Sequence, residues 1–412
     1  MRRVAVSGMG VVSPLGNNPA DVLAAACAGR SGVRQLQGPL ASRLNAPLAA
    51  LAEFDEKAHF DAAQLRLMDR FSLMALYAAN QAVAASQGAL AGPDRSRAGL
   101  FMGNGMGGTL TMDAGYKTLY GDMSDRIKPF TILMGMHNAA TAWIGMAHDV
   151  QGPALTYSTA CSSSAVAIGE AWLRVASGQL DVALAGGAEA PLSCGSLKAW
   201  EALHTGATVD ADAPWASCRP FAGNRSGMVL GEGAAMLVLE PWDRAQARGA
   251  PILGEVLGYG LSNDASHITR PQVQGQVSAM RAALQSAGLT PFDVDAVNAH
   301  GTGTQANDLA ETLALKAVFG ARAQQVPVSA TKAMHGHLLG AAGALECVLS
   351  LLAMQAQVAL PTMHLQQADP ECDLDYVPNA ARHGFAAATM LSNSFAFGGT
   401  NAVLVLGGPA RA

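Results

Sequence analysis

Three apolar segments of the sequence each end in reactive side chains that come directly before a segment with helical spacing. Cys161 follows ALTYSTA, His300 follows DAVNA, and Lys332 and His337 follow VPVSAT in the segment TKAMHGH. Active sites of α/β proteins lie at such strand ends. We therefore predict that these four residues form one site, in which a nucleophile works beside acid–base groups.

Cys161 is the candidate nucleophile, because a helix is predicted to begin at this residue and to run to Gly178. The free N–H groups and partial positive charge of a helix N-terminus favour a thiolate, which predicts a thiol pKa below its usual value of ~8.5. The alternative is a buried structural cysteine, the commoner role of a lone cysteine. For His300 the corresponding alternative is a histidine with a purely structural hydrogen bond.

A fourth segment, LSNSFAFGGTNAVLVL, places Phe397, Gly398 and Gly399 between two apolar runs. The two glycines could present backbone N–H groups to a negatively charged oxygen, and they would give Phe397 freedom to move. A core hairpin without chemical function is the alternative. The segment is nevertheless a candidate part of the same site.

Two cofactor sites are disfavoured by the spacing. Residues 103–108, GNGMGG, match the dinucleotide fingerprint, but the segment after them lacks the apolar helix of a βαβ unit. His335 and His337 could bind zinc together with His300 and Cys161, yet the sequence has neither a helical H-x-x-x-H pair nor a second short-spaced pair. We therefore predict no metal and no nicotinamide cofactor.

The elements that position these residues are predicted from hydropathy. Short apolar runs indicate buried strands, and segments between several of them have helical spacing. The predicted strands are 4–7, 98–102, 154–158, 182–185, 228–239, 252–257, 294–298, 326–329, 386–391 and 402–406. Alternating strands and helices predict an α/β fold with a largely parallel sheet, covered by helices on both faces.

The order of these elements is similar in the two halves of the chain, which indicates a duplication. The charged stretch EPWDRAQARGAP, residues 240–251, is the best candidate boundary. We accordingly expect one domain at 1–245, which carries the cysteine, and a second at 246–412, which carries the histidines.

Composition restricts the class of protein. Of the 412 residues, 50% are hydrophobic and 14% are charged, so the chain has a large core and little disorder. A net charge of -5 disfavours nucleic acid as a partner. The six cysteines are widely spaced, which suits a reducing cytoplasm. Glycines and Pro14 interrupt the first apolar run, and the run at 345–360 is shorter than a ~20-residue membrane span, so we expect neither export nor a membrane.

Together the four segments resemble the elongating 3-oxoacyl-[acyl-carrier-protein] synthases, most closely the synthase II type. The shared motifs are STACSSS, NAHGTGT, TKAMHGHLLGAAGALE, NSFAFGGTN, GMGVVSPLG, MDRF, GGAEA and SGMVLGEGA, and they span nearly the whole chain. The resemblance implies a thiolase-like α/β fold, in which two duplicated halves form a five-layered α-β-α-β-α arrangement, normally as a dimer.

The resemblance also implies roles for the site residues. Cys161 would take an acyl chain from acyl carrier protein as a thioester. His300 and His337 would promote decarboxylation of malonyl-carrier protein and stabilise the enolate. Phe397 would be a gatekeeper, and its N–H group would form an oxyanion hole with that of Cys161.

Four further residues have implied supporting roles. Lys332 and Glu311 would organise the site, while Thr302 and Thr304 would contact the phosphopantetheine arm that carries the substrates. The enzyme itself would need no bound cofactor.

Some positions depart from the family pattern. Trp200 stands near the acyl tunnel where a smaller residue is usual, and Met106 occupies another tunnel position. His335 replaces a threonine or another small residue. FAFGG replaces FGFGG, so Ala396 would stiffen the gate.

The basic patch that would dock the carrier protein is thinned. Arg66 and Arg70 are the basic residues of AQLRLMDRF, and His204 stands where arginine is common. These differences lean towards a dedicated pathway.

The implied reaction is a decarboxylative Claisen condensation that extends a fatty-acid or polyketide chain by two carbons. The expected partners are acyl carrier protein and either a second copy or a chain-length-factor homologue. The alternatives are the ketosynthase subunit of a type II polyketide or polyene pathway, and a non-catalytic chain-length factor, which would lack Cys161. A degradative thiolase is disfavoured, because it would need a second active cysteine near the C-terminus. An initiating synthase is disfavoured, because it would use Cys-His-Asn in place of a cysteine and two histidines.

Overall fold

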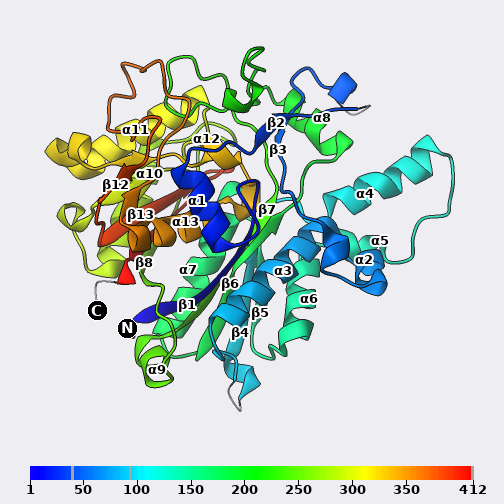
Figure 1. Ribbon diagram of the computed structural model, residues 1–412, viewed down its shortest axis with the longest axis horizontal. Helices are drawn as coiled ribbons and strands as arrows, with labels where there is room; N and C mark the ends of the chain where they lie inside the picture. The colour runs from blue at the N-terminus through cyan, green and yellow to red at the C-terminus, as the bar shows by residue number, and fades with distance from the viewer. Residues whose placement is uncertain (39–40, 92–93, 410–412) are drawn as a thin grey trace.

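A ten-stranded sheet forms the centre of the computed structural model, which describes residues 1–38, 41–91 and 94–409 (Figure 1). Its strands follow the order β10-β9-β13-β14-β8-β1-β7-β6-β4-β5. Their bounds are β1 (Val4–Val12), β4 (Ala98–Gly103), β5 (Ala154–Tyr157), β6 (Val182–Glu189), β7 (Gly233–Pro241), β8 (Gly254–Asn263), β9 (Ala296–Asn298), β10 (Val328–Ser329), β13 (Thr389–Phe395) and β14 (Thr400–Gly407). Two small sheets pair β2 (Val33–Gln35) with β3 (Leu48–Ala50), and β11 (Val358–Ala359) with β12 (Arg382–His383).

The strand order shows the duplication that the sequence indicates. From its outer edge inward, each half contains its third, second, fourth, fifth and first strands along the chain, and the halves meet where β1 pairs antiparallel with β8. In each half the three outer strands pair in parallel, and the two remaining pairings, towards the junction, are antiparallel. The expectation of a largely parallel sheet is therefore wrong. A tight connection such as the one between β13 and β14 permits only antiparallel pairing.

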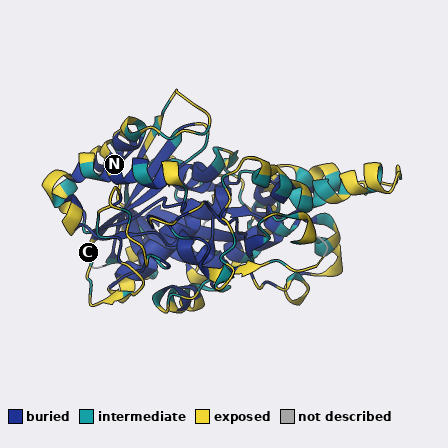
Figure 2. Ribbon diagram, turned by 90° about the horizontal axis from the view of Figure 1, so that it is seen from above, coloured by how far each residue is buried: buried dark blue, intermediate teal, exposed yellow. Residues whose placement is uncertain are grey.

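The two halves of the sheet form two layers, and helices form three more. α3 (Arg70–Ala85) covers β1 and β7 on one outer face, and α10 (Val273–Ala287) covers β8 and β14 on the other. Between the halves, α7 (Ser163–Ala176) and α13 (Ala342–Ala356) contact each other and strands of both halves. The arrangement is α-β-α-β-α, with buried residues concentrated in the sheets and central helices (Figure 2). The remaining α-helices are α1 (Pro19–Cys27), α2 (Ala62–Leu67), α4 (Thr109–Tyr116), α5 (Thr131–Gly135), α6 (Ala139–His148), α8 (Cys194–Ala202), α9 (Trp242–Ala247), α11 (Gln305–Phe319) and α12 (Lys332–His335).

The central helix α13 is buried from Ala342 to Met354 because its sides are almost entirely apolar. The segment Leu339–Ala356 is long and apolar enough to cross a membrane, but 89% of it is buried within the protein. Its one charged residue, Glu346, is buried too and pairs with Lys332. The segment is therefore a core helix of this fold.

The predicted strands differ from the observed ones in their bounds: β1 extends to Val12, for example, and β8 to Asn263. Residues 228–232 form only isolated bridges, and β7 begins at Gly233. β5 is exposed or half-buried along its length, because it is the edge strand and pairs only with β4. The expectation that β5 is a buried strand is therefore wrong for a single chain.

Candidate active site

The reactive residues lie at the ends of strands, as their sequence positions predict. Cys161 lies in the 3-10 turn Ala160–Ser162 between β5 and α7, and His300 follows β9. Lys332 begins α12 just after β10, and His337 follows α12. The preceding Ala160 has φ 51°, a left-handed conformation that is strained for a residue with a side chain. This turn presents Cys161 to the other residues.

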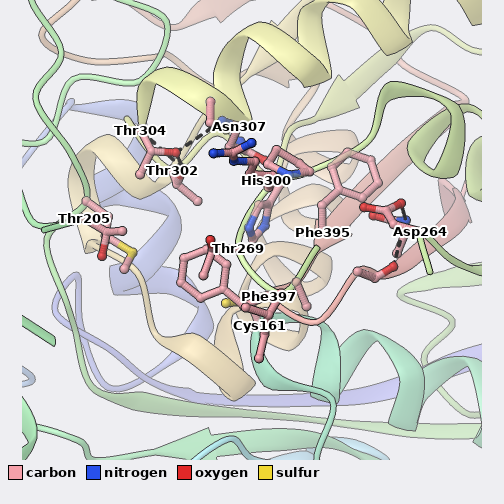
Figure 3. Close-up of a pocket in the computed structure, with 18 of the residues that line it drawn as sticks. Cys161, Thr205, Asp264, Thr269, His300, Thr302, Thr304, Asn307, Phe395 and Phe397 are labelled. Carbon is pink, nitrogen blue, oxygen red and sulfur yellow. Dashed lines mark hydrogen bonds between the residues drawn. The ribbon is translucent and has the colours of Figure 1, made fainter. Parts of the chain in front are cut away.

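Cys161, His300 and His337 converge inside the protein. Figure 3 shows Cys161 and His300 in the same pocket. Nε2 of His337 lies 3.0 Å from Sγ of Cys161, and the two imidazole rings are 5.4 Å apart at 83°. One nitrogen of each ring and the sulfur lie within 4.8 Å of one another. The pair of histidines and the thiol therefore face one small volume.

Both histidines are neutral and have defined tautomers. Burial, and then the charge of Lys332, hold the pKa of each far below its usual value. The N–H of Leu339 donates to Nδ1 of His337 at 3.3 Å, and the Lys332 ammonium lies 3.4 Å from Nδ1 of His300. A neutral ring whose Nδ1 accepts a hydrogen bond carries its proton on Nε2. The two imidazoles therefore act as Nε2–H donors.

The electrostatics of Cys161 differ from the prediction made from its helix N-terminus. Burial raises the thiol pKa to about 11, while the Lys332 charge and the backbone N–H groups of Phe397 and Cys161 lower it. Loss of water around a buried thiolate outweighs the helix terminus. The prediction of a lowered pKa is therefore wrong, although the two N–H groups do face the sulfur.

Lys332 connects the two histidine segments from a fully buried position. Its ammonium donates to the carbonyl oxygen of His300 at 2.6 Å and forms an ion pair with Glu346. Glu346 was missed by the sequence reasoning, although a single carboxylate in an otherwise apolar helix is a signal that a buried cation lies nearby.

Glu311 fixes the backbone at His300. Its carboxylate accepts from the N–H groups of His300 at 2.8 Å and Gly301 at 2.9 Å, and from the amide of Asn393 at 3.0 Å. Asn393 on β13 is a second residue that the sequence analysis missed. Glu311 therefore contacts the histidine segment without facing the thiol.

A pocket opens at Cys161 and is lined by Phe397, Thr302 and Thr304. The two threonine hydroxyls are 2.9 Å apart and lie on the same side of the pocket as His300 (Figure 3). They are therefore positioned along an approach to the sulfur.

The glycines after Phe397 do not supply free donors. The N–H of Gly398 donates to Ile268 at 2.8 Å, and that of Gly399 donates to Ala396 at 3.0 Å. The expectation that these N–H groups stabilise an oxyanion is wrong, because both already donate to main-chain carbonyl oxygens, one of them within the turn. Their φ values of 86° and 82° instead allow the tight turn that aims the Phe397 N–H at the sulfur.

Trp200 and Met106 lie beside this pocket. The Trp200 indole stacks on Phe397 with ring centroids 6.2 Å apart, and its Nε1–H points at Sδ of Met106 at 3.5 Å. Both side chains pack against the apolar cluster that contains Cys161. His204 faces a separate cleft, which Trp200 also lines.

The remaining predicted residues lie in different surroundings. The guanidinium of Arg70 pairs with Glu232 and Glu56 and donates to main-chain carbonyls, so it is held inside the fold and is not free for docking. Arg66 is exposed. His335 is fully buried, and its Nε2 lies 3.0 Å from Oγ1 of Thr331.

The geometry disfavours both cofactor sites. Within residues 1–38, 41–91 and 94–409, the group of side chains close enough to share a metal ion is Cys161, His300 and His337. The nearby ammonium of Lys332 would repel a cation there. At residues 103–108, the carboxylate of Glu189 accepts the N–H groups that would bind a phosphate. Helix α4 after this loop buries none of its residues.

Comparisons with known proteins agree with this geometry. Residues 1–245 match the model of the beta-ketoacyl synthase N-terminal domain, and 253–366 match that of the C-terminal domain. The chain is 44% identical to Nodulation protein E of Rhizobium meliloti and 41% identical to 3-oxoacyl-[acyl-carrier-protein] synthase 2 of Coxiella burnetii, over 98% of each chain. The ishigamide ketosynthase/chain length factor superposes with a TM-score of 0.91 at 32% identity, over 99% of both chains. The chain therefore belongs to the beta-ketoacyl synthase family, with its thiolase-like fold and its carbon–carbon bond-forming acyl transfer.

Proposed function

We propose that this protein joins an acyl thioester on Cys161 to malonyl-acyl carrier protein by decarboxylative Claisen condensation. The single observation that carries the proposal is the placement of two neutral imidazoles, with Nε2–H donors, beside one buried thiol. An enolate needs hydrogen-bond donors that do not protonate its carbon, and neutral imidazole fits this need.

The first half-reaction loads the enzyme. The sulfur of Cys161 attacks the carbonyl carbon of an acyl thioester on the carrier protein, and the carrier thiol leaves with the proton of Cys161. The negative charge on the carbonyl oxygen falls between the N–H groups of Cys161 and Phe397, which face the sulfur.

The second half-reaction forms the carbon–carbon bond. Malonyl-carrier protein loses CO2, and the electrons of the broken bond form an enolate whose oxygen accepts from Nε2–H of His300 and His337. The enolate carbon attacks the thioester carbonyl, and Cys161 leaves as a thiolate beside the Lys332 charge. The product is a 3-oxoacyl chain, two carbons longer, on the carrier protein. No step requires a metal or a nicotinamide.

The supporting residues hold this arrangement. Lys332 directs Nδ1 of His300 as an acceptor, and Glu311 holds the His300 backbone. Thr302 and Thr304 would contact the phosphopantetheine arm as it enters the pocket. We propose Arg66, which is exposed, as a docking contact for the carrier protein, whereas the buried ion pairs of Arg70 limit it to holding that segment.

A dimer is part of the proposal. The segment from α4 to the edge strand β5 carries many exposed large apolar residues, and the similar solved structures include a ketosynthase/chain length factor. Its exposed residues are Tyr116, Tyr120, Met123, Ile127, Phe130, Ile132, Leu133, Met136, Met146 and Leu155. Exposed large apolar side chains in such number are typical of a segment that takes part in a protein interface. The partner is a second copy or a chain-length-factor homologue. The complex works in the cytoplasm, and its site is formed by the two domains 1–245 and 246–412 of this chain.

Acylation followed by mass spectrometry tests the reaction. The protein is incubated with acyl carrier protein loaded with chains of several lengths, and the adduct is located by peptide mapping. We expect the acyl mass on Cys161 and no adduct in Cys161→Ala. An adduct on another residue, with Cys161 unmodified, would overturn the assignment.

A dedicated polyketide or polyene pathway is the second candidate. The size of Trp200 beside Phe397 and Met106 favours it, because a large indole changes the shape of the space around the acyl chain. The same acylation profile separates the candidates. A fatty-acid enzyme would accept saturated chains over a broad range, whereas a dedicated ketosynthase would prefer unsaturated or polyketide chains on its own carrier protein.

A further inference from the structure

Glu189 is a fully buried carboxylate for which the reaction above has no use. It ends β6, and its side chain accepts three backbone hydrogen bonds. Oε2 accepts from Gly105 at 2.6 Å and Gly340 at 3.0 Å, and Oε1 accepts from Met106 at 3.0 Å. A buried carboxylate with several directed donors is an organised contact between chain segments.

The three donors come from two segments that border the thiol. Gly105 and Met106 belong to the loop after β4, and Met106 contacts Trp200 at the apolar cluster of Cys161. Gly340 follows His337 by three residues, in the turn whose Leu339 N–H sets the tautomer of that histidine. One side chain therefore holds both the apolar wall and the histidine turn.

The two segments pack closely against each other and against this carboxylate. A Cβ added at Gly340 would lie 2.4 Å from the backbone nitrogen of Gly105, and one added at Gly105 would lie 3.1 Å from Oε2 of Glu189. The two segments approach this closely only because both positions are glycine. A change in the carboxylate is therefore transmitted directly to both segments.

We infer that Glu189 is a positioning residue that locks the Met106 wall of the acyl site to the turn carrying His337, so that chain-length preference depends on it. The inference rests on the proposed function, since it assumes that the acyl chain on Cys161 lies against this wall. Glu189 itself contacts no reacting atom.

The charge of Glu189 has a second effect at the thiol. It is one of the groups that raise the pKa of Cys161, after burial. Its own pKa is raised by burial to about 7, so it is ionised over the alkaline range in which the thiol titrates. Removal of this charge should make the thiolate easier to form.

Two substitutions separate geometry from charge. Glu189→Gln keeps the length but removes the charge and turns an NH2 group towards N–H donors, whereas Glu189→Asp keeps the charge and shortens the reach. Glu240→Gln is the matched control, because Glu240 is also fully buried and charged but pairs with Arg244 and Arg248.

The first measurement is the rate of Cys161 alkylation by iodoacetamide as a function of pH, without carrier protein. We expect the profile of Glu189→Gln to move to lower pH, and those of Glu189→Asp and Glu240→Gln to stay in place. This readout requires no acyl substrate, so its result stands whether or not the proposed condensation is correct.

The second measurement is the relative rate of Cys161 acylation by short and long chains on the carrier protein. We expect the short-to-long ratio to change by about 10- to 100-fold in both Glu189 variants, since small misplacements near a site have effects of this size. An unchanged ratio in folded Glu189→Asp, or an equal change in Glu240→Gln, would overturn the inference. Unchanged ratios with normal acylation would leave the proposed function intact, whereas absence of any acylation of the wild-type protein would refute the function itself.

Discussion

Substitution of Trp200 by alanine tests whether this indole shapes the acyl site or only fills the core. Trp200 is half-buried, stacks on Phe397 and points its Nε1–H at Met106. Loss of the side chain opens space next to both neighbours. We expect the profile of Cys161 acylation to shift towards longer or bulkier chains.

The expected loss of stability follows from the partial burial. A fully buried tryptophan removes ~150–250 Å² from water, and about two thirds to nine tenths of that area at about 25 cal/mol per Å² corresponds to about 2.5–5.5 kcal/mol. A smaller additional loss comes from the aromatic pair with Phe397. Trp200→Ala should therefore remain folded, with a reduced free energy of unfolding.

Trp242→Ala is the matched control. This indole is 6% exposed, and the guanidinium carbon of Arg3 lies 3.8 Å from its ring centroid. It belongs to a different apolar cluster from the one that contains the thiol. Its loss should lower the free energy of unfolding by about 3–5 kcal/mol without a change in chain preference.

The assay combines urea unfolding with mass-spectrometric acylation yields for carrier-bound chains of several lengths. A tunnel wall gives a changed chain preference together with the loss of stability, whereas the control loses stability alone. If Trp200→Ala instead behaves as Trp242→Ala does, with a large loss and an unchanged preference, the reasoning about Trp200 is refuted.

Four other predictions concern the remaining site and surface. Cys161→Gln should stop condensation while malonyl-carrier decarboxylation continues, because the amide imitates an acylated thiol; release of CO2 measures this, and continued condensation would contradict it. His300→Ala and His337→Ala should each slow decarboxylation by about 10²–10³ while Cys161 still acylates, since each removes one donor to the enolate; complete loss of acylation in both folded variants would show that a histidine is needed as base for the thiol. His335 is buried with its pKa lowered to about 3, so the folded protein holds it neutral. Its contribution to the free energy of unfolding is complete above the unfolded pKa and is lost as the pH falls, because the unfolded chain then binds a proton that the folded protein does not. Between pH 7 and 5 the free energy of unfolding should therefore fall by about 2 kcal/mol more in the wild type than in His335→Thr. Equal decreases in urea titrations would contradict the burial argument. Arg66→Glu should slow association with acyl carrier protein at low salt, because it reverses an exposed charge on the proposed docking surface; unchanged kinetics at all salt concentrations would exclude this contact.

The strand ends that bear Cys161, His300 and Lys332 could be predicted from local sequence alone. Apolar runs of strand length indicate strands, although the run before Cys161 shows that they do not fix burial. Their alternation with helical spacing limits the number of folds. The duplication was visible for the same reason, because the order of elements is a property of the chain. The pairing directions were not, since whether β1, β7, β8 and β14 run parallel or antiparallel depends on contacts between distant segments.

The chemical state of the site was decided by the tertiary structure. A helix N-terminus in the sequence argued for an acidic Cys161, but the folded protein removes water from the thiol and raises its pKa instead. The proton positions on His300 and His337 depend on an ammonium and an N–H group supplied by other segments. Sequence motifs name residue types, and they do not contain these distances.

The same limit applies to the buried charges. Arg70 resembles a docking residue in its motif, yet Glu56 and Glu232 hold it within the fold. Glu189 lies in a short motif that suggests no contact at all, and folding brings its carboxylate to backbone donors from segments 84 and 151 residues away. The sequence by itself determines which groups are available and at which strand ends they lie. Only the tertiary structure decides their partners, because hydrogen bonds and desolvation act between atoms that folding brings together.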